Sequence, residues 1–545
     1  MRRMKGAAGL LTALLLAFQL SAQTFALANE DNGIKVVPVN FTHNGYSYEI
    51  EGVAKSTDGD YQIKSPARLA ARKLPSTYDP RSSGEITTVK DQASTGACWA
   101  FSALACAEQD LIKKGLENPS AEFSVPALVL SSNSGTATGK DDFSSGGNWL
   151  FAASTLANGQ GLCYEDYEPF LESGTENMIV SENKKSVSEY RLNYVMELSS
   201  TTQVKRKIME LGAVSASYFA GNGYMNHNNT AYYDPDASKN TIINHSVTVV
   251  GWDDNYSKDN FRYKPANNGA WLVKGSWGAD QDNDGFYWVS YDEAEFGQFC
   301  CYDFEESCDN TYHYSKMTGY VVNASNDGSV YGANVFTAKA DEKLDKAGFM
   351  YVGKTGSADY TLSVYTDVSD SDPIGVLETQ ISGSVSANGF YTVDFPEDIL
   401  LEEGEKYSIS VKFSGDSGRG YLLAESDRTS KAQSGQSYVS LNGKYWSDVG
   451  ADKTDSIGSL FIYAYTDDTA KPDKSSLETT LAKYGTLAGC EREANNARTV
   501  LADENASKND ISNAQKLLIS AAEEQDEALV ITTEAQWESF AKRVS

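Results

Sequence analysis

The sequence is poor in cysteine and histidine. Among 545 residues there are seven cysteines and four histidines, and no two cysteines have C-x-x-C spacing. A structural zinc site is therefore not expected, and the cysteine density is too low for a small disulfide scaffold. Because seven is odd, at least one cysteine has no disulfide partner in a monomer. Cys300, Cys301 and Cys308 are close enough in sequence for one local bridge, which the sequence does not assign.

Basic residues and long apolar runs are also scarce. Lys and Arg total 46 against 75 Asp and Glu, which gives a formal net charge of −29. Nucleic acids and anionic membrane surfaces would repel such a chain, so neither is expected as a partner. No stretch reaches the roughly 18 consecutive apolar residues that a membrane-spanning helix requires, so no membrane span is expected.

The N-terminus has the features of a secretory signal peptide. Arg2, Arg3 and Lys5 precede an apolar run over 7–18, and Ala26-Leu27-Ala28 offers an A-x-A cleavage site. The apolar run is too short to anchor the chain in a bilayer. A buried N-terminal helix is the less favoured alternative. The mature protein is therefore predicted to be secreted or associated with the cell surface.

Changes in pattern divide the chain into regions. In the first large region helical periodicity precedes short strands, which predicts an α+β domain. The next region alternates apolar and polar residues between polar turns, which predicts an all-β sandwich. A helical hairpin or small bundle follows. The predicted limits are 1–28 for the signal peptide, 29–74 for a short pro-segment or linker, 75–303 for the α+β domain, 304–469 for the β-sandwich, 470–531 for the helical module and 532–545 for the start of an incomplete module.

Several individual elements can be predicted. Gly115 is a natural stop for the first helix, and Ser507 with Asp510 resembles a capping box that opens a later helix. Helices are expected at 98–114, 148–158 and 203–211, and strands at 214–218, 246–251, 270–274 and 285–291 in the α+β domain and at 360–366, 389–395, 407–413 and 459–466 in the β-sandwich.

The strongest chemical signal is the segment 92–102, QASTGACWAFS. A glycine-bearing loop leads into a helix, and Cys98 stands at the helix start. The partial positive charge of a helix N-terminus lowers the pKa of a thiol, and the resulting thiolate is a nucleophile. Gln92 can turn its side-chain amide toward the same point and form an oxyanion hole with the Cys98 backbone N–H. The alternative, a buried structural cysteine, does not explain the whole segment.

A thiolate nucleophile needs a base. His245 enters an apolar strand in the segment 243–252, INHSVTVVGW. An imidazole there can pair with the thiolate and later protonate the leaving amine. The other histidines are weaker candidates, because His43 precedes the domain, His227 lies in an Asn-rich loop and His313 lies beyond the domain.

These segments resemble the papain family of cysteine peptidases, over residues 74 to about 302. LPSTYDPR at 74–81 is similar to the family's mature start, SSGG at 144–147 to its Gly-Gly segment, and AWLVKGSWG at 270–278 to its Asn-Ser-Trp-Gly strand. His245 also follows Cys98 at the separation of papain-type enzymes. The resemblance implies a papain-like two-lobed fold with the cleft between the lobes. It also implies hydrolysis of protein or peptide substrates through an acyl-enzyme, with no cofactor.

Three departures from the family pattern bear on activity. Gly275 stands where the family has its catalytic asparagine, whose amide orients the imidazole, so slower catalysis is expected. Asn244 could replace that amide only with an unusual side-chain direction. Thr95 and Ser144 stand where the family usually places a cysteine pair, and residues 29–74 are too short for its usual inhibitory propeptide.

The resemblance also assigns substrate contacts. Gly146 and Gly147 would pair with the substrate backbone, Ser217 and Asn244 fall near the second subsite, and Trp277 would shield the site. No metal is expected: the segment 280–285 imitates the start of a calcium loop, but position twelve is a tyrosine rather than a glutamate.

The β-rich region resembles the lectin-like module that follows papain-like domains in secreted proteins of anaerobic Gram-positive bacteria. The match lies in the order of YVV at 320–322, ANVF at 333–336 and AGFMYV at 347–352. The helical tail is similar to small helical modules of bacterial surface proteins. Both resemblances imply association with the cell surface or its glycans. A β-module that only braces the peptidase is an equal alternative.

The function expected from the sequence is that of a secreted bacterial cysteine endopeptidase. The competing class is a binding protein, in which a catalytically weak or inactive papain fold serves as an adhesin. Gly275 favours the binding protein, whereas the intact set of Gln92, Cys98 and His245 favours the enzyme.

Overall fold

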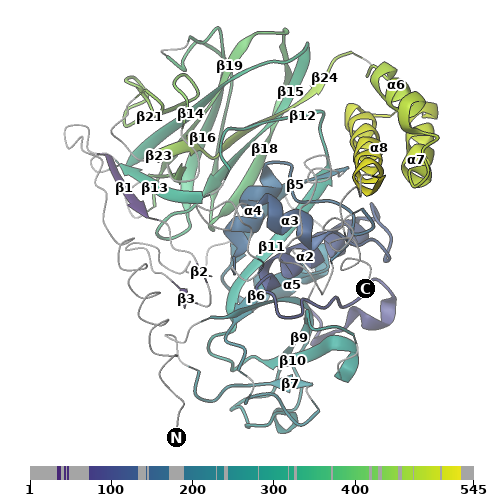
Figure 1. Ribbon diagram of the computed structural model, residues 1–545. Coiled ribbons are helices and arrows are strands. Elements are labelled where there is room, and N and C mark those ends of the chain that lie inside the picture. Colours follow the sequence, from purple (N-terminus) through teal and green to yellow (C-terminus); the bar gives the residue numbers. More distant parts are fainter. Residues whose placement is uncertain are drawn as a thin grey trace, which may run out of the picture.

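The structure is a computed structural model in which the main chain is described over most of the sequence after residue 72 (Figure 1). The described residues are 34–38, 42–43, 46–47, 73–132, 143, 146–167, 169–170, 189–221, 223–228, 230–237, 243–279, 282–316, 318–324, 328–369, 372–416, 420–426, 432–451, 457–470, 472–503 and 506–529. The predicted signal peptide, most of the predicted linker and the segment 532–545 lie outside the described residues.

The first domain has helices on one side and strands on the other, as the sequence predicted. Its helices are α2 (Cys98–Lys114), α3 (Val125–Ser131), α4 (Trp149–Ala157) and α5 (Thr201–Leu211). Its main strands are β5 (Tyr190–Leu198), β6 (Val214–Tyr218), β8 (His245–Asp253), β9 (Ala270–Lys274), β10 (Phe286–Ser290) and β11 (Gly297–Glu306). Strands β5 and β11 and helix α3 had not been predicted.

Helix α2 is the central element of this domain. It is buried from Trp99 to Leu111, because most of these residues are apolar and the buried carboxylates of Glu108 and Asp110 are paired with lysines. The helix ends where Gly115 adopts φ 73°, and the N–H of Gly115 returns to the carbonyl of Ile112. A buried helix of this kind holds its first residue, Cys98, in a fixed position.

The second domain is a β-sandwich, as predicted. One six-stranded sheet contains β14 (Ser329–Thr337), β16 (Ala358–Thr366), β17 (Val376–Val385), β19 (Lys406–Ser414), β21 (Ser437–Ser440) and β22 (Ser447–Asp448). The facing layer contains β12 (Asn310–Tyr312), β15 (Glu342–Tyr351), β18 (Gly389–Leu401) and β24 (Ile462–Asp468). Phe349 lies 5.2 Å from Phe413 and 5.0 Å from Tyr360, ring centre to ring centre, so the two layers pack through aromatic side chains.

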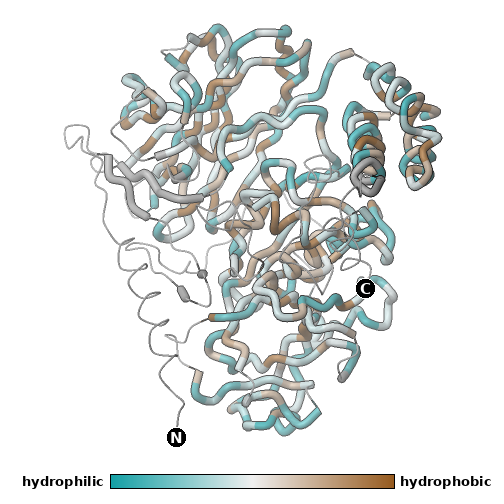
Figure 2. The backbone as a smooth tube through the Cα atoms, in the orientation of Figure 1, coloured by the Kyte–Doolittle hydropathy of each residue, from teal (hydrophilic) through white to brown (hydrophobic). Residues whose placement is uncertain are grey.

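The two domains share one sheet. The strand order β12-β24-β15-β18-β5-β11-β6-β8-β9-β10 passes from the sandwich into the first domain through the pairing of β18 with β5. One continuous apolar core covers both sides of this junction. Figure 1 shows β5 and β11 running between the two domains, and Figure 2 shows hydrophobic residues along α2 to α4 and along the strands of the sandwich.

The C-terminal part forms three helices, α6 (Ser475–Tyr484), α7 (Glu491–Ala502) and α8 (Lys508–Leu529). The sequence predicted a helical hairpin or a small bundle, and the segment around Gly485 and Gly489 separates α6 from α7. The predicted capping box is present: the N–H of Asp510 donates to the Ser507 hydroxyl, and the N–H of Ser507 donates to the Asp510 carboxylate.

The helical module is docked on the rest of the chain. Lys508 forms an ion pair of 2.8 Å with Asp468 of β24, Leu517 packs against Ala127 and Cys163 of the first domain, and Arg492 lies over the Tyr167 ring. Among the described residues, no helix is long and apolar enough to cross a membrane, and no cluster of three potential metal ligands is present. No disulfide joins the seven cysteines, all of which are described.

Candidate active site

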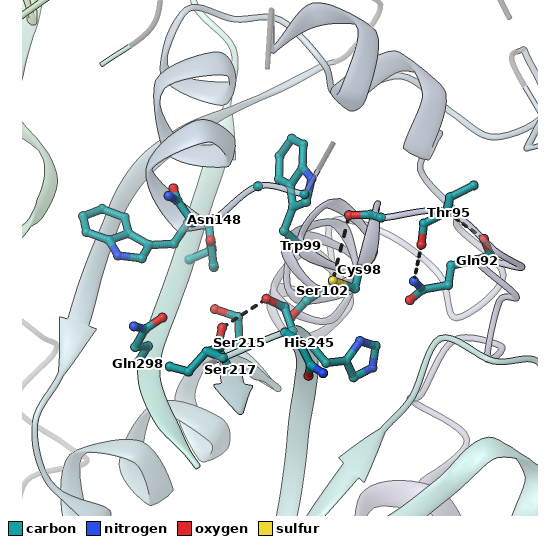
Figure 3. Close-up of a pocket in the computed structure, with 18 residues that line it drawn as sticks. Gln92, Thr95, Cys98, Trp99, Ser102, Asn148, Ser215, Ser217, His245 and Gln298 are labelled. Atoms are coloured by element: carbon teal, nitrogen blue, oxygen red, sulfur yellow. Dashed lines mark hydrogen bonds between the residues drawn. The ribbon is translucent and has the colours of Figure 1, made fainter. Parts of the chain in front are cut away.

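A cleft with room for about 290 Å³ opens between the N-terminus of α2 and the strands β6, β8 and β11 (Figure 3). Seven of the residues predicted from the sequence line it together: Gln92, Cys98, Gly146, Gly147, Ser217, Asn244 and His245. The other two predicted residues do not. Trp277 stacks on His245 from outside, and Gly275 lines a small hollow behind the cleft.

Cys98 is the first residue of α2 and points into the cleft. Its Sγ lies 4.0 Å from the carbonyl oxygen of Gly96. Burial raises the pKa of the Cys98 thiol, although hydrogen bonds from the N–H groups of Ser246 and Trp99 act in the opposite direction. The expected lowering of the thiol pKa by the helix terminus is thus not found, because desolvation of the thiolate outweighs it. The raised pKa favours the thiol over the thiolate.

His245 is the first residue of β8 and is only 6% exposed. Its ring stacks on Trp277 at a centroid distance of 4.5 Å and an angle of 7°, and it meets the Tyr218 ring edge-on at 5.9 Å. Burial lowers the pKa of His245 to about 4, so the imidazole is neutral at neutral pH. A neutral imidazole can accept the proton of the Cys98 thiol.

The ring nitrogen Nε2 of His245 is unpaired within the described part of the chain. Among the described residues nothing donates to or accepts from Nε2, which is buried. Gly275 offers no side chain, and a Cβ built there would lie 3.1 Å from the Gly285 carbonyl oxygen and 3.4 Å from Cε1 of Tyr287. Tyr287 therefore borders the space into which a side chain at this position would extend.

Aromatic packing holds the imidazole instead. The Tyr287 ring stacks beside Trp277 at 6.2 Å, and its hydroxyl lies 2.9 Å from the hydroxyl of Tyr218. Trp277 and Tyr218 thus contact the His245 ring, and Tyr287 contacts both of them. Ring packing restricts the plane of the imidazole, but it supplies no acceptor for the second N–H of an imidazolium ion.

Asn244 does not replace the missing amide. Its Oδ1 accepts from the backbone N–H of Ala220 at 2.7 Å, and its Nδ2 donates to the Ala220 carbonyl at 3.3 Å. Both ends of the amide are therefore used by the backbone of the preceding loop. Ser217 lies beside this loop, with its hydroxyl 3.0 Å from that of Ser246.

Gln92 is fixed in one orientation. It is 5% exposed, its Oε1 accepts from the Ser276 hydroxyl at 2.5 Å, and its Nε2 donates to the Thr95 carbonyl at 2.8 Å. Its backbone N–H also donates to the Ser276 carbonyl. One Nε2 hydrogen remains available for a ligand. The Cys98 N–H at the start of the helix is likewise without an intrahelical acceptor.

Gly147 is a sterically required glycine. A Cβ at this position would lie 2.5 Å from the indole of Trp99, so the loop can pass over this ring only without a side chain. Asn148 then caps α4, since its Oδ1 accepts from the N–H groups of Leu150 and Phe151. The loop backbone at Gly146 and Gly147 consequently lies along the cleft.

A buried charged cluster lies beneath the cleft and connects α2 to β9. The Glu108 carboxylate accepts from Thr87 at 2.6 Å and from the backbone N–H of Phe123 at 3.0 Å, and lies 3.4 Å from Lys90 and 3.8 Å from Lys274. Burial raises the pKa of Glu108, but the two lysines and the hydrogen bonds together lower it by more. The net pKa is therefore below the usual value, and the carboxylate is ionised. Removing one partner would leave an uncompensated charge, which is costly.

Sequence reasoning missed several residues of the cleft. Ser215, Gln298 and Tyr302 line it from β6 and β11, and Trp149 lines it from the start of α4. Two of these four, Gln298 and Tyr302, come from β11, which the sequence pattern did not reveal. Only Trp149 carried a usable signal, because it directly follows the Gly-Gly-Asn segment.

Comparison with known proteins agrees with this geometry. Residues 74–324 match the family described as papain family cysteine protease, and residues 311–466 match the family described as lectin like domain. One similar solved structure contains the cysteine protease and lectin-like domains of Cwp84, a surface layer associated protein of Clostridium difficile. Its sequence is 25% identical to this chain and its TM-score is 0.65. The match covers 80% of this chain and 99% of the Cwp84 chain. The clostridial protease Cwp84 after propeptide cleavage gives 27% identity and a TM-score of 0.63, covering 72% of this chain and all of the other.

Among curated proteins, mouse cathepsin K is 24% identical over 216 residues and cat procathepsin L is 28% identical over 224 residues. The alignments cover 39% and 40% of this chain, and 59% and 62% of those relatives. The chain thus spans about three fifths of the length of the curated relatives that it matches.

Proposed function

Since this chain carries a papain-family cysteine protease domain followed by a lectin-like domain, we propose that it is a secreted cysteine endopeptidase that cuts peptide bonds through Cys98. The observation that carries the proposal is the meeting of Cys98, His245 and the fixed Gln92 amide in one cleft. Nucleophile, base and oxyanion donor are the groups that acyl transfer to a thiol requires.

The reaction follows from the protonation states. The neutral His245 imidazole accepts the thiol proton of Cys98 as the sulfur attacks the substrate carbonyl carbon. The charge that develops on the carbonyl oxygen is stabilised by the free Nε2 hydrogen of Gln92 and the N–H of Cys98. The imidazolium then gives its proton to the leaving amine. Water, deprotonated by His245, hydrolyses the thioester and restores the thiol.

A second candidate function is that of an adhesin with weak or absent catalysis. The unpaired Nε2 of His245 favours it, because an imidazolium is poorly stabilised there. Labelling of the purified chain with an epoxysuccinyl probe at neutral pH separates the two. The enzyme predicts a covalent adduct located on Cys98 by peptide mapping. Absence of the adduct, after any pro-segment has been removed, would exclude the enzyme.

The β-sandwich is proposed to bind glycans at the cell surface. Its relative Cwp84 is described as surface layer associated. Tyr445 lies on the loop between β21 and β22 and is 80% exposed. The Asn442 side chain holds this loop, because its Oδ1 accepts hydrogen bonds from the backbone N–H groups of Lys444 and Tyr445. An exposed aromatic ring with a hydroxyl suits the apolar face of a sugar.

The glycan proposal has a matched test. Tyr445→Ala should weaken retention on immobilised cell-wall polysaccharide about tenfold, the loss expected when an exposed aromatic anchor is truncated. Leu400→Ala, which removes a similarly exposed apolar side chain from β18, should leave retention unchanged. Equal retention of both variants would favour a sandwich that only braces the peptidase.

A further inference from the structure

The β-sandwich meets the substrate-binding part of the peptidase where β18 pairs with β5. Gly389 and Phe390, which open β18, pair with Met196 and Val195 of β5. A Cβ on Gly389 would lie 2.1 Å from the Val195 carbonyl oxygen, so only a glycine allows the two strands to approach this closely. The close pairing of β18 with β5 therefore depends on the glycine at position 389.

Asn388 holds the peptidase side of this junction. It is 4% exposed, and its Oδ1 accepts from the N–H of Gly353 in its own domain at 2.9 Å. Its Nδ2 donates to the carboxylate of Glu197 on β5 at 3.0 Å, and its carbonyl accepts from the Glu197 N–H at 2.9 Å. Glu197 is thus bound to the sandwich through both backbone and side chain.

Glu197 lies between the domain junction and Trp149, a residue that lines the cleft. Helix α4 packs on β5, and the Glu197 carboxylate lies within interaction range of the side chain of Trp149, the first residue of α4. Trp149 lines the cleft together with Asn148 and Gln298. Figure 3 shows Asn148 and Gln298 at the end of the pocket opposite Gln92, with Cys98 between them.

We infer that Asn388 and Glu197 are positioning residues that fix the Trp149 indole in the cleft wall, so that the lectin-like domain sets how tightly the cleft holds an extended peptide. The inference rests on the proposed peptidase function only for the nature of the ligand. A peptide long enough to pass Gly146 and Gly147 reaches Trp149, whereas a single blocked residue next to Cys98 does not. The chain from Asn388 to Trp149 should therefore affect long peptides alone.

The test measures peptide affinity in the full chain carrying Cys98→Ala, which needs no turnover. Asn388→Ala in this background should weaken binding of a hexapeptide about tenfold and leave that of a blocked single-residue amide unchanged, as expected for a displaced cleft wall. Glu197→Gln approaches the same contact from the peptidase side and should act in the same direction. Combined with Trp149→Phe, Asn388→Ala should have no further effect, because the two act through one chain of contacts.

A matched control separates positioning from general stability. Asn334 is a buried asparagine of the sandwich whose amide donates to the carbonyls of Leu460 and Ile462, away from β5. Asn334→Ala should lower the melting temperature without changing the ratio of hexapeptide to single-residue affinity. If Asn388→Ala does the same, the junction only joins the domains and the inference is overturned.

The two proposals fail in different ways. Hydrolysis of the hexapeptide by the unmodified chain, with an unchanged affinity ratio in the Asn388 and Glu197 variants, supports the peptidase and rejects the positioning role. A changed ratio without any hydrolysis supports the positioning role and rejects the peptidase. Absence of peptide binding rejects both.

Discussion

The two walls of the cleft hold their reactive groups in different ways. On the wall formed by α2 and the loop before it, Gln92 is fixed by three hydrogen bonds and Cys98 by a fully packed helix. On the wall formed by β6 and β8, His245 is held by ring packing, and among the described residues its buried Nε2 is unpaired. In the proposed reaction, the nucleophile and oxyanion side thus has its groups in place, whereas the base side lacks a group that would stabilise the imidazolium.

Because of this difference, we expect catalysis to be slow at the step in which His245 takes up a proton. Attack by Cys98 requires His245 to become charged, and burial opposes that charge. The oxyanion donors need no such change, because they are oriented before the substrate arrives. Turnover should therefore be limited by proton transfer to His245 rather than by charge development on the substrate.

The largest expected effect is on the nucleophile itself. Cys98→Ala should lower kcat/KM on a peptide substrate by about 10⁴-fold or more, because no other group can form the acyl-enzyme. Cys106→Ala is the matched control, since Cys106 is a buried cysteine of the same helix outside the cleft. Comparable loss of activity in both variants would assign the effect to the helix and not to the thiol.

The oxyanion side gives the next largest effect. Gln92→Ala should lower kcat by about 10²- to 10³-fold with little change in KM, as removal of one oxyanion donor does elsewhere. Ser276→Ala removes the hydroxyl that fixes the Gln92 amide and should lower kcat by about tenfold. A Ser276 variant with unchanged kcat would show that the amide needs no fixing.

The base side can be tested through the pH dependence of stability. The pKa of His245 is lowered from 6.5 to about 4 by burial, so the unfolded chain binds a proton there that the folded chain does not between these values. Stability from this group is complete above pH 6.5 and falls as the pH drops toward 4, by up to roughly 3 kcal/mol. Urea unfolding of the unmodified chain and of His245→Gln at several pH values measures this difference.

Other groups act in both chains alike and cancel in that comparison. Burial raises the pKa of Glu293 and of Asp110 to about 7, and these carboxyls contribute with the opposite sign. If the two chains lose stability in parallel below pH 6.5, His245 is accessible to protons in the folded state and the account of its burial is wrong.

Local signals explain what could be predicted from the sequence. The limits of α2 agree with the predicted 98–114, because apolar spacing and Gly115 act within one element. Strands β6 and β9 also agree with their predicted ranges, since short apolar runs between turns are local features. The need of a thiolate for a base and the separation typical of papain-type enzymes brought Gln92, Cys98 and His245 into one hypothesis, and all three line the cleft.

What could not be predicted depends on partners far away in the sequence. Polar residues interrupt the alternation of apolar and polar residues in strands β5 and β11. These polar residues form hydrogen bonds between the two strands, as when Asn193 donates to Asp303 at 2.7 Å. The hydrogen bond from Asn388 to Glu197 joins two domains and has no local pattern. The pKa of Cys98 likewise depends on burial by the whole fold, so the helix terminus alone gave the wrong direction.

The smallest expected effect is a gain, and it tests the comparison most directly. Gly275→Asn supplies an amide oxygen that can accept from the Nε2–H of His245 and so stabilise the imidazolium. The new side chain meets the Gly285 carbonyl oxygen at 3.1 Å and Tyr287 at 3.4 Å, so the single variant is crowded. Gly275→Asn combined with Tyr287→Leu, compared with Tyr287→Leu alone, should raise kcat about tenfold, a modest part of what an orienting group contributes in complete triads.

The same pair of variants should also move the pH dependence of Cys98 alkylation. An acceptor on Nε2 raises the pKa of His245 and favours the thiolate–imidazolium pair, so labelling by a neutral alkylating reagent should persist to lower pH. Tyr287→Leu alone lacks the acceptor and should not extend labelling in this way. Identical labelling profiles and identical kcat in the two variants would mean that the unpaired nitrogen is not what limits the base, and the weakness would then lie in the burial of the His245 ring itself.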